Sequence, residues 1–405
     1  MASLVERYVG LGLAVGRHIP GYVDAYYGPP ALAERAAAGP PEDPALLVDR
    51  ARALLAALDA GEPLEAAGTG APDPGTEAGR RRRRWLRAQL VGVLTTVRVL
   101  GGEHLAYADE VELSYGVRPR RLPADELAAV HRELDALVPG SGPLAERLVA
   151  WREAQAIPPD RLEPALHSLA EDLRERTSRL FSLPEGEHVD FALVTSKPWS
   201  GFNHYLGDLR SRVEINVDLP VLATSIAHLV AHEAYPGHHS EHTRKEVGLV
   251  RARRQLEETI FLVGTPQCLL AEGLADLGLE VVVGSGLVEL LAEHLRPLKI
   301  GYDPDAVTVL AQAGETLGAA RANAAFRLHE DGADPEVVVT ELAREALLPR
   351  KRAEKAVEFL LDPTWRAYIT CYVEGVRRCR DFVGGRPERF ARLLGEQLTP
   401  DDLCA

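Results

Sequence analysis

The spacing of hydrophobic residues predicts a chain that is helical for most of its length. Between residues 46 and 58, apolar side chains recur every three or four positions, as on one face of an amphipathic helix. Before the next helix, residues 61–79 are rich in Gly, Pro and Ala and predict an exposed loop. Further helices are predicted from Arg80 through Val97 and over residues 124–137, 143–156 and 162–183.

The periodicity changes between residues 188 and 219. Residues 188–196 and 212–219 are short, roughly alternating and rich in β-branched side chains, which predicts two strands. Residues 201–207 between them are a candidate third strand. Pro220 suits the first turn of a helix, and helical spacing then continues almost to the end. The predicted fold class is therefore mainly α, with a small antiparallel sheet just before a His-rich helix.

Composition narrows the class of protein. The chain has 405 residues, 46% of them hydrophobic and 26% charged, as in ordinary globular proteins. We expect an N-terminal helical region over residues 1–187 and a metal-site region over 188–405, joined as one continuous unit. The net charge of −14 opposes binding to nucleic acid or to an anionic membrane. The five arginines at 80–84 are interpreted as a solvated helix face rather than a phosphate-binding patch.

Compartment is inferred from two further features. The sequence contains no uninterrupted stretch of about 18 apolar residues, so no membrane span is predicted. The first residues also lack the pattern of a signal peptide. The four cysteines, at 268, 371, 379 and 404, show no CxxC pairing and are expected to be reduced thiols. A cytoplasmic location is the expectation.

The densest chemistry lies in HEAYPGHHSEH, from His232 to His242. It is close to HExxH, in which two His one helical turn apart bind zinc and the Glu serves as general base. Here Pro236 stands where the second His would be. Such a crowd of imidazoles and a carboxylate, Glu233, on a largely apolar helix is costly unless the groups pair or bind a metal.

The second His ligand depends on what Pro236 does to the helix. Proline removes a hydrogen bond to the carbonyl of His232, so a kink is expected at residues 235–237. A straight helix would favour His239, whereas a Pro-Gly bulge that absorbs two residues would favour His238. We prefer His238 and keep His239 as the alternate. The pair His228 and His232 has one-turn spacing and ranks last.

The third ligand is sought in EGLADLGLE, downstream of the His-rich segment. Glu272, Asp276 and Glu280 recur every four residues among leucines, which places them on one helical face. Glu272 is the natural third ligand. Asp276 would then hydrogen-bond a ligating His from behind. Two imidazoles and a carboxylate fit one zinc ion per chain, although another divalent metal is also possible.

These motifs, followed by RANAAFRLHEDG and YITCYVEG, resemble the bacterial domain-of-unknown-function 885 family. Its pattern is HEAxPGHH, EGWAxYxE, Arg…Asp-Thr-Gly-x-His and Tyr-x-x-Gly. The resemblance covers residues 188–383, and the early GYVDAYYGPP also looks like family members. The family is similar to gluzincin metallopeptidases. The resemblance therefore implies a zincin-like, mainly helical metallopeptidase architecture.

Carried over by position, the resemblance implies roles for further residues. They are His232, Glu233, His238 or His239, Glu272, Arg321, His329, Tyr372 and Gly375. The chain departs from the family pattern at Leu274 and Leu277, where Trp and Tyr are usual, and at Ala325, where Asp is usual. These departures leave the candidate ligands intact but put contacts with substrate, and support around His329, in doubt.

The predicted function is hydrolysis of a peptide or small amide. Glu233 would act as general base, and Tyr372 or His329 would donate a hydrogen bond to the oxyanion. Arg321 and Asp276 would support the site. The strand at residues 212–219, taken as an edge strand, could pair with an extended peptide. The alternatives are a non-catalytic metal-binding or scaffold protein on a degenerate peptidase fold, and a metal hydrolase of non-peptide amides or esters.

Overall fold

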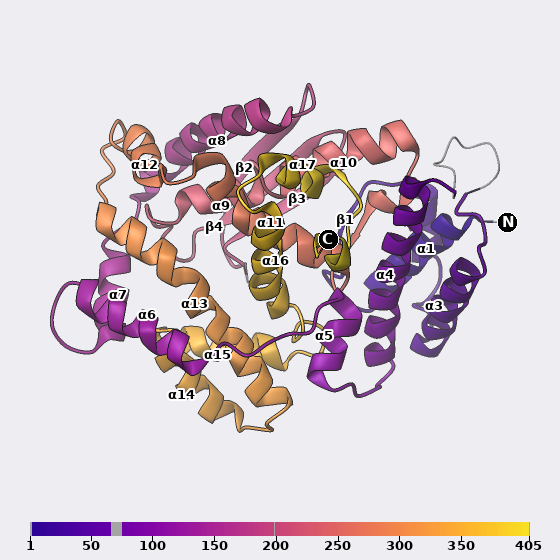
Figure 1. Cartoon of the computed structure of the whole chain (residues 1–405), viewed down its shortest axis with the longest axis horizontal. Helices are drawn as coiled ribbons and strands as arrows, with labels where there is room; N and C mark the ends of the chain where they lie inside the picture. The colour runs from indigo at the N-terminus through magenta and orange to yellow at the C-terminus, as the bar shows by residue number, and fades with distance from the viewer. Residues whose placement is uncertain (1, 66–74, 198, 405) are drawn as a thin grey trace.

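Helices dominate the computed structural model, which describes residues 2–65, 75–197 and 199–404. A small sheet lies on one side of the helical body (Figure 1), so the predicted fold class is confirmed. The helices of the first half are α1 (Leu4–Gly16), α2 (Pro30–Ala37), α3 (Pro44–Asp59), α4 (Glu77–Leu100), α5 (Tyr107–Tyr115), α6 (Ala124–Leu137), α7 (Leu144–Glu153) and α8 (Pro159–Phe181).

The helices of the second half surround the His-rich segment. They are α9 (Ile226–Glu233), α10 (His238–Lys245), α11 (Pro266–Val283), α12 (Leu287–Leu295), α13 (Pro304–His329), α14 (Pro335–Glu345), α15 (Arg350–Leu361), α16 (Val376–Val383) and α17 (Pro387–Gly395). The predicted helix from Pro220 begins only at Ile226, because residues 220–225 form a turn and an isolated bridge between Leu222 and Ala156.

The predicted helices of the first half agree with the structure to within a few residues. An exception is α4, which begins three residues before Arg80 because the Thr76 side chain accepts a hydrogen bond from the Gly79 N–H and caps the helix. Of the predicted loop over residues 61–79, residues 66–74 lie outside the described part of the chain.

The three predicted strands form one sheet, with the order β2 (His188–Val194), β4 (Arg210–Asn216), β3 (Gly201–Gly207). Strand β3 pairs antiparallel with β4, as predicted, whereas β2 runs parallel to β4. The interpretation of residues 212–219 as an edge strand is wrong, because β4 lies in the centre with partners on both sides. Alternation of side chains reveals a strand but not its neighbours.

A second, two-stranded sheet was not foreseen from the sequence. Strand β1 (Val23–Tyr26) pairs antiparallel with β5 (Ile260–Leu262), more than two hundred positions away. The register shifts between Val23 and Ala25, so Asp24 lies at a bulge. This pairing ties the N-terminal region to the segment that precedes α11, and β1 also packs against β3.

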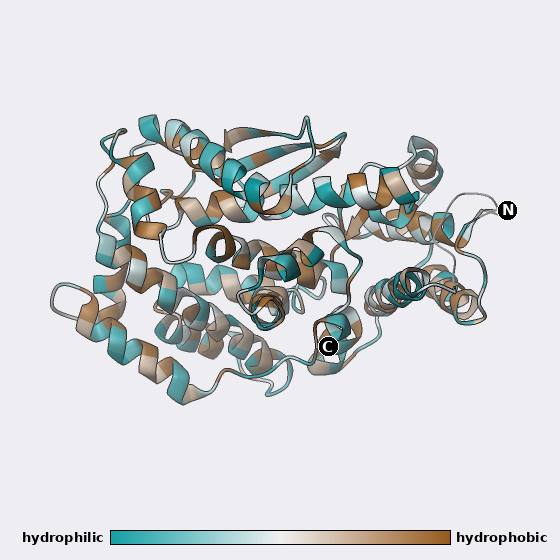
Figure 2. Ribbon diagram, turned by 45° about the horizontal axis from the view of Figure 1, so that its top comes forward, coloured by the Kyte–Doolittle hydropathy of each residue, from teal (hydrophilic) through white to brown (hydrophobic). Residues whose placement is uncertain are grey.

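One hydrophobic core runs from Leu4 to Leu403, and a smaller cluster joins α6, α7 and α13. Figure 2 shows both hydrophilic and hydrophobic stretches along most outer helices, as expected of amphipathic helices packed on a core. By contrast, α11 is buried along most of its length. Within the described residues, no helix combines the length and the apolar character needed to cross a bilayer.

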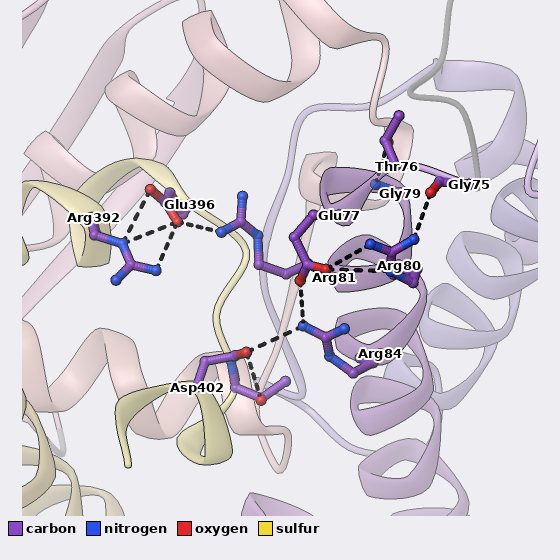
Figure 3. A network of polar contacts seen from close by, with 11 residues as sticks. Gly75, Thr76, Glu77, Gly79, Arg80, Arg81, Arg84, Arg392, Glu396 and Asp402 are labelled. Carbon is purple, nitrogen blue, oxygen red and sulfur yellow. Dashed lines mark hydrogen bonds and ion pairs between the residues drawn. The ribbon is translucent and has the colours of Figure 1, made fainter. Parts of the chain in front are cut away.

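The arginine run at the start of α4 is engaged within the protein. Arg80 and Arg84 pair with Glu77, and Arg81 pairs with Glu396 near the C-terminus (Figure 3). Arg82 is buried, at 2% exposure, which the interpretation as a solvated face did not anticipate. The run therefore joins α4 to the C-terminal segment instead of forming a free basic patch.

The cysteines are free thiols, as predicted from their spacing. Cys268, Cys371 and Cys379 are buried, and Cys404 is exposed.

Candidate metal centre

The His-rich segment is two helices joined by a tight bend. Helix α9 ends at Glu233, the backbone leaves the helical region at Ala234, and α10 begins at His238. At Gly237 a Cβ atom would lie 1.9 Å from the carbonyl oxygen of His232, so only glycine fits there. The Gly237 N–H donates to the carbonyl of Ala231, six residues earlier. The kink predicted around Pro236 is thus present as a full break.

Helix α11 packs directly on this bend. A Cβ atom at Gly278 would come within 2.9 Å of the Pro236 ring, and the absence of a side chain lets the helix approach. On its other side, α11 touches a π-helical turn, η3 (Cys371–Gly375), through Gly273 and Gly375. This close packing holds the acidic face of α11 against α9 and α10.

Three candidate ligands converge between these helices. The Nε2 atoms of His232 and His238 lie 3.2 Å apart. Oxygens of Glu272 lie 3.5 Å from His232 Nε2 and 3.6 Å from His238 Nε2. Oε2 of Glu272 is buried and has no hydrogen-bond partner among the described residues. An unpaired buried carboxylate oxygen facing two imidazole nitrogens is a costly arrangement that a cation would relieve.

The distances suit a small metal ion. Ligand atoms bonded at about 2.0–2.2 Å in a tetrahedron are separated by about 3.3–3.6 Å, which is close to the spacing found here. Burial lowers the pKa of His238 to about 4, so its imidazole is neutral, as a ligand must be. The residues present therefore fit a divalent metal with nitrogen and oxygen ligands.

Asp276 orients His232. Its Oδ1 lies 2.9 Å from His232 Nδ1, which leaves Nε2 facing the cluster. Burial would lower the pKa of His232, but the neighbouring carboxylates of Asp276 and Glu272 outweigh it and raise that pKa. His228 also approaches Asp276, at 3.5 Å, and the three residues form a second group that could hold a metal. His228 is exposed. The carboxylate in this second group is Asp276, which is already hydrogen-bonded to His232.

Glu233 faces the same space with its side chain free. It is 6% exposed, and its carboxylate makes no hydrogen bond or ion pair within the described residues. Burial, with the nearby charges of Glu272 and Asp276, raises its pKa to about 7 despite the opposing effect of His232. The main chain is held from the sheet, because Asn203 Nδ2 donates to the Glu233 carbonyl at 2.6 Å.

The edge strand β3 begins beside Glu233. A Cβ atom at Gly201 would lie 2.8 Å from Glu233 Oε1 and from Leu229. The absence of a side chain at Gly201 therefore lets the strand come close to the general-base candidate. The sequence did not identify β3 as the edge strand, because the predicted edge strand lay in its neighbour β4.

His239 points away from the cluster, which separates the two alternatives that the sequence left open. Its Nε2 lies 2.8 Å from Glu187, its Nδ1 lies 2.8 Å from the Ser211 hydroxyl, and the residue is fully buried. Tyr235 also donates to Glu187. His239 thus fixes α10 to the sheet, and His238 is the one brought to His232 and Glu272.

Tyr368, which sequence reasoning missed, contacts the cluster, and Tyr372 packs against Tyr368. Tyr368 donates a hydrogen bond to Glu272 Oε1 at 3.0 Å, and its ring meets that of Tyr372 at 5.4 Å. Partial burial and the charge of Glu272 raise the pKa of Tyr372, which keeps its hydroxyl protonated. Tyr372 lies in η3 and is 41% exposed. The four-residue spacing from Tyr372 was the available signal for Tyr368.

Arg321 and His329 on α13 are not brought to the three ligands. His329 Nε2 lies 2.7 Å from the Leu360 carbonyl, and its ring stacks on Tyr107. None of the contacts described for His329 involves the cluster, so the expectation of an oxyanion donor there lacks structural support. The side chain of Arg321 is largely exposed at its surface, and partial desolvation of its guanidinium, followed by the charge of Arg352, lowers its pKa, while Tyr372 opposes that shift.

Asp24 at the β1 bulge is a further residue that sequence reasoning missed. Burial, followed by the charges of Glu272 and Glu233, raises the pKa of Asp24 to about 7. GYVDAYYGPP stood out in the sequence, but nothing in it linked this segment to residues more than two hundred positions away.

Comparisons with known proteins show a similar fold in solved structures but do not assign the chain to a family. No family model matches the chain, and no curated protein matches it. A protein from Colwellia psychrerythraea, described as a lipoprotein, has a similar structure with a TM-score of 0.52 at 15% identity. The match covers 79% of this chain, which spans 55% of that protein. The likeness shows the fold, and the resemblance to the 885 family remains a prediction.

Two other solved structures are more distant. A protein of unknown function from Shewanella oneidensis, also described as a lipoprotein, gives a TM-score of 0.45 at 12% identity, over 88% of this chain and 70% of that one. An M32 carboxypeptidase from Deinococcus radiodurans gives 0.45 at 13% identity, over 99% and 93%.

Proposed function

We propose that this chain is a metal-dependent hydrolase that cleaves peptide or related amide bonds. One observation carries the proposal: donor atoms of His232, His238 and Glu272 all lie within 4.8 Å of one another, beside an unpaired carboxylate on Glu233. These three residues would hold one divalent ion, and zinc suits two imidazoles with one carboxylate. A protein that only stores metal has no need for a free carboxylate next to a ligand.

Each residue has a defined task in this proposal. Bound zinc would supply Lewis acidity and make water acidic enough to lose a proton near neutral pH. Glu233 accepts that proton and passes it to the leaving amine. Asp276 holds His232 in one tautomer and orientation, and Tyr368 fixes the carboxylate of Glu272.

Tyr372 is the proposed donor to the oxyanion. Its hydroxyl is protonated and its ring stands next to Tyr368, on the side of the cluster formed by η3. A donor of this kind commonly contributes about 10²-fold or more to the rate. An extended substrate would lie along β3, whose first residue touches Glu233, and would pair with its backbone.

The test is metal analysis of purified protein followed by assays with a quenched peptide library. We expect about one zinc per chain, and a fall of about 10²–10⁴-fold in kcat for Glu233→Gln with the metal retained. Glu280→Gln is the matched control, because Glu280 is an exposed acid on α11 that pairs with Arg380. It should leave activity unchanged.

Two results would favour the alternative functions. Stoichiometric metal with equal inactivity of wild type and Glu233→Gln on peptides and esters would indicate a non-catalytic metal-binding protein. If the protein cleaves only esters or non-peptide amides, and Glu233→Gln abolishes that activity, the chain is a metal-dependent hydrolase but not a peptidase.

A further inference from the structure

Four aromatic side chains form a row that ends at the candidate metal centre. They are Phe359 of α15, Trp365 and Tyr368 in the turns that follow it, and Tyr372 of η3, and they are called the aromatic row below. Ring centroids lie 6.2 Å apart for Phe359 and Trp365, and 5.8 Å apart for Trp365 and Tyr368. Those of Tyr368 and Tyr372 lie 5.4 Å apart. All three separations are typical of aromatic rings in contact.

The segment LDPTWRAYITCY builds most of this row. Asp362 Oδ1 accepts a hydrogen bond from the Thr364 N–H at 2.8 Å, which turns the chain at the end of α15. The Tyr368 N–H then donates to the Trp365 carbonyl at 2.9 Å, so the turns continue in a helical sense. Trp365, Tyr368 and Tyr372 follow one another at spacings of three and four residues. This spacing brings their rings to the same side of the segment.

The inner end of the row touches a candidate metal ligand. Tyr368 donates a hydrogen bond to Glu272 Oε1 at 3.0 Å, and the ring of Phe359 lies 6.3 Å from the ring of Tyr368. Each residue of an extended peptide spans about 3.3–3.6 Å. The residues on either side of a bond cleaved at the metal are therefore the parts of a substrate whose side chains lie closest to the row.

The outer part of the row is open to solvent. Phe359 is 37% exposed and Tyr372 is 41% exposed, whereas Trp85 in the core is fully buried. The turn before β1 packs against the row, because a Cβ atom on Gly21 would meet the Trp365 ring at 3.4 Å. Exposed rings that touch one another present apolar surface to water. A substrate side chain that covers this surface gains the free energy of its burial.

We propose that the aromatic row binds an aromatic or large aliphatic side chain of the substrate, on a residue next to the cleaved bond. Continuity with the centre identifies the occupant, because the ring whose hydroxyl holds Glu272 also packs against Trp365 and Tyr372. This inference rests on the proposed hydrolase function and adds a side-chain preference to it. Burial of a Phe-sized side chain should favour binding by about 10–100-fold over Ala.

The first experiment scans substrate side chains with the wild-type protein and its metal. Quenched peptides carry Phe, Leu or Ala at one of the two positions that flank the cleaved bond. At one of these positions, kcat/KM should be about 10–100-fold higher for Phe or Leu than for Ala. Cleavage without a preference at either position would overturn the inference and leave the hydrolase proposal standing. If no peptide is cleaved, the proposed function fails, and a binding measurement decides the inference.

Phe359→Ala tests the outer end of the row without changing Tyr368 or Tyr372. It should lower kcat/KM for the peptide with Phe by about 3–10-fold, chiefly through KM, and leave the peptide with Ala within about twofold. Phe359→Leu should recover part of the loss. Leu361→Ala is the matched control, because Leu361 is 45% exposed on the same helix but two positions along, where it faces another side. Equal losses for both peptides would indicate a structural effect on the centre and overturn the inference.

The binding measurement removes the dependence on turnover. Phenylalanine hydroxamate and alanine hydroxamate carry the same metal-binding group and differ only in the side chain offered to the row. In metal-loaded Glu233→Gln protein, calorimetry should show about 10–100-fold tighter binding of the phenylalanine compound. Adding Phe359→Ala should reduce this difference by about 3–10-fold, in a variant whose melting temperature stays close to that of the parent. Equal affinities for the two compounds would contradict the inference whatever the activity.

Sedimentation of the wild type and of Phe359→Ala tests a different use of the same surface. We expect both proteins to have the same oligomeric state, because the row is reserved for substrate. Self-association of the wild type that Phe359→Ala abolishes would assign the row to a contact between copies of the chain and overturn the inference.

Discussion

Two adjacent histidines have opposite roles because the chain breaks directly before them. His238 and His239 follow Gly237, and the bend sends His238 toward His232 and Glu272 while His239 enters the interior beside Glu187. Burial lowers the pKa of both imidazoles. The difference lies in their partners: His238 faces His232 and Glu272, whereas both ring nitrogens of His239 are hydrogen-bonded, to Glu187 and Ser211.

Alanine substitutions should separate these roles. His238→Ala should lose the metal, whereas His239→Ala should keep it but lower the free energy of unfolding of the apoprotein by about 3 kcal/mol, because Glu187 loses a buried partner. Metal content after dialysis and denaturant unfolding measure the two effects. Retention of metal by His238→Ala together with its loss in His239→Ala would exchange the assignments.

Asp276 should tune metal affinity without binding the ion. Replacement by Asn removes the charge that holds His232 Nδ1 and should weaken zinc binding by about 10–100-fold. Competition with a fluorescent chelator measures this, with Glu280→Gln on the same helix as the control. An unchanged affinity would mean that packing alone orients His232.

At the scale of elements, the sequence predicts what depends on local periodicity and misses what depends on distant neighbours. Helices α3, α6 and α8 were found because their apolar faces repeat regularly, and the break at Pro236 followed from the chemistry of proline. The central place of β4 and the pairing of β1 with β5 depend on partners that a local pattern does not specify. The contact of Tyr368 with Glu272 was missed for the same reason, since only the fold brings them together.

The contact between α11 and η3 should be sensitive to one added carbon. A Cβ atom at Gly375 would lie 2.5 Å from the Leu269 carbonyl oxygen, so Gly375→Ala must push the two elements apart. We expect a loss of about 1–3 kcal/mol in unfolding free energy. The shift of Tyr372 should also reduce kcat. Gly314→Ala on α13 is the control, because a Cβ atom there meets nothing and should be neutral or slightly stabilising.

At the scale of the whole molecule, a buried polar cluster joins parts of the chain that are far apart in sequence. Arg82 of α4 pairs with Glu257 of the short helix η2 (Leu256–Thr259), and Gln397 near the C-terminus donates to both Glu257 and Glu258. Lys245 of α10 pairs with Glu241 and lies near Glu258. Arg82 of the arginine run thus lies in the interior, where an unpaired charge would destabilise the fold.

Glu258 makes the stability of this cluster depend on pH. Burial is the largest cause of its raised pKa, which is about 7 in the folded protein against an ordinary value of 4.5. The folded state therefore holds a proton that the unfolded state releases, and the stabilisation from this proton is complete below pH 4.5 and is lost as the pH rises through 7.

Glu258→Gln removes this titration and should reveal its size. Relative to wild type, the variant should gain unfolding free energy as the pH rises from 4.5 to 8, by about 3 kcal/mol for a shift of this size. Titrating groups that do not interact with Glu258 cancel in the comparison because both proteins contain them. Changes in hydrogen bonding to Gln397 add a constant that does not vary with pH. Urea unfolding of both proteins at four pH values measures the difference, and a difference that stays flat between pH 5 and 8 would mean that Glu258 is charged in the folded protein throughout.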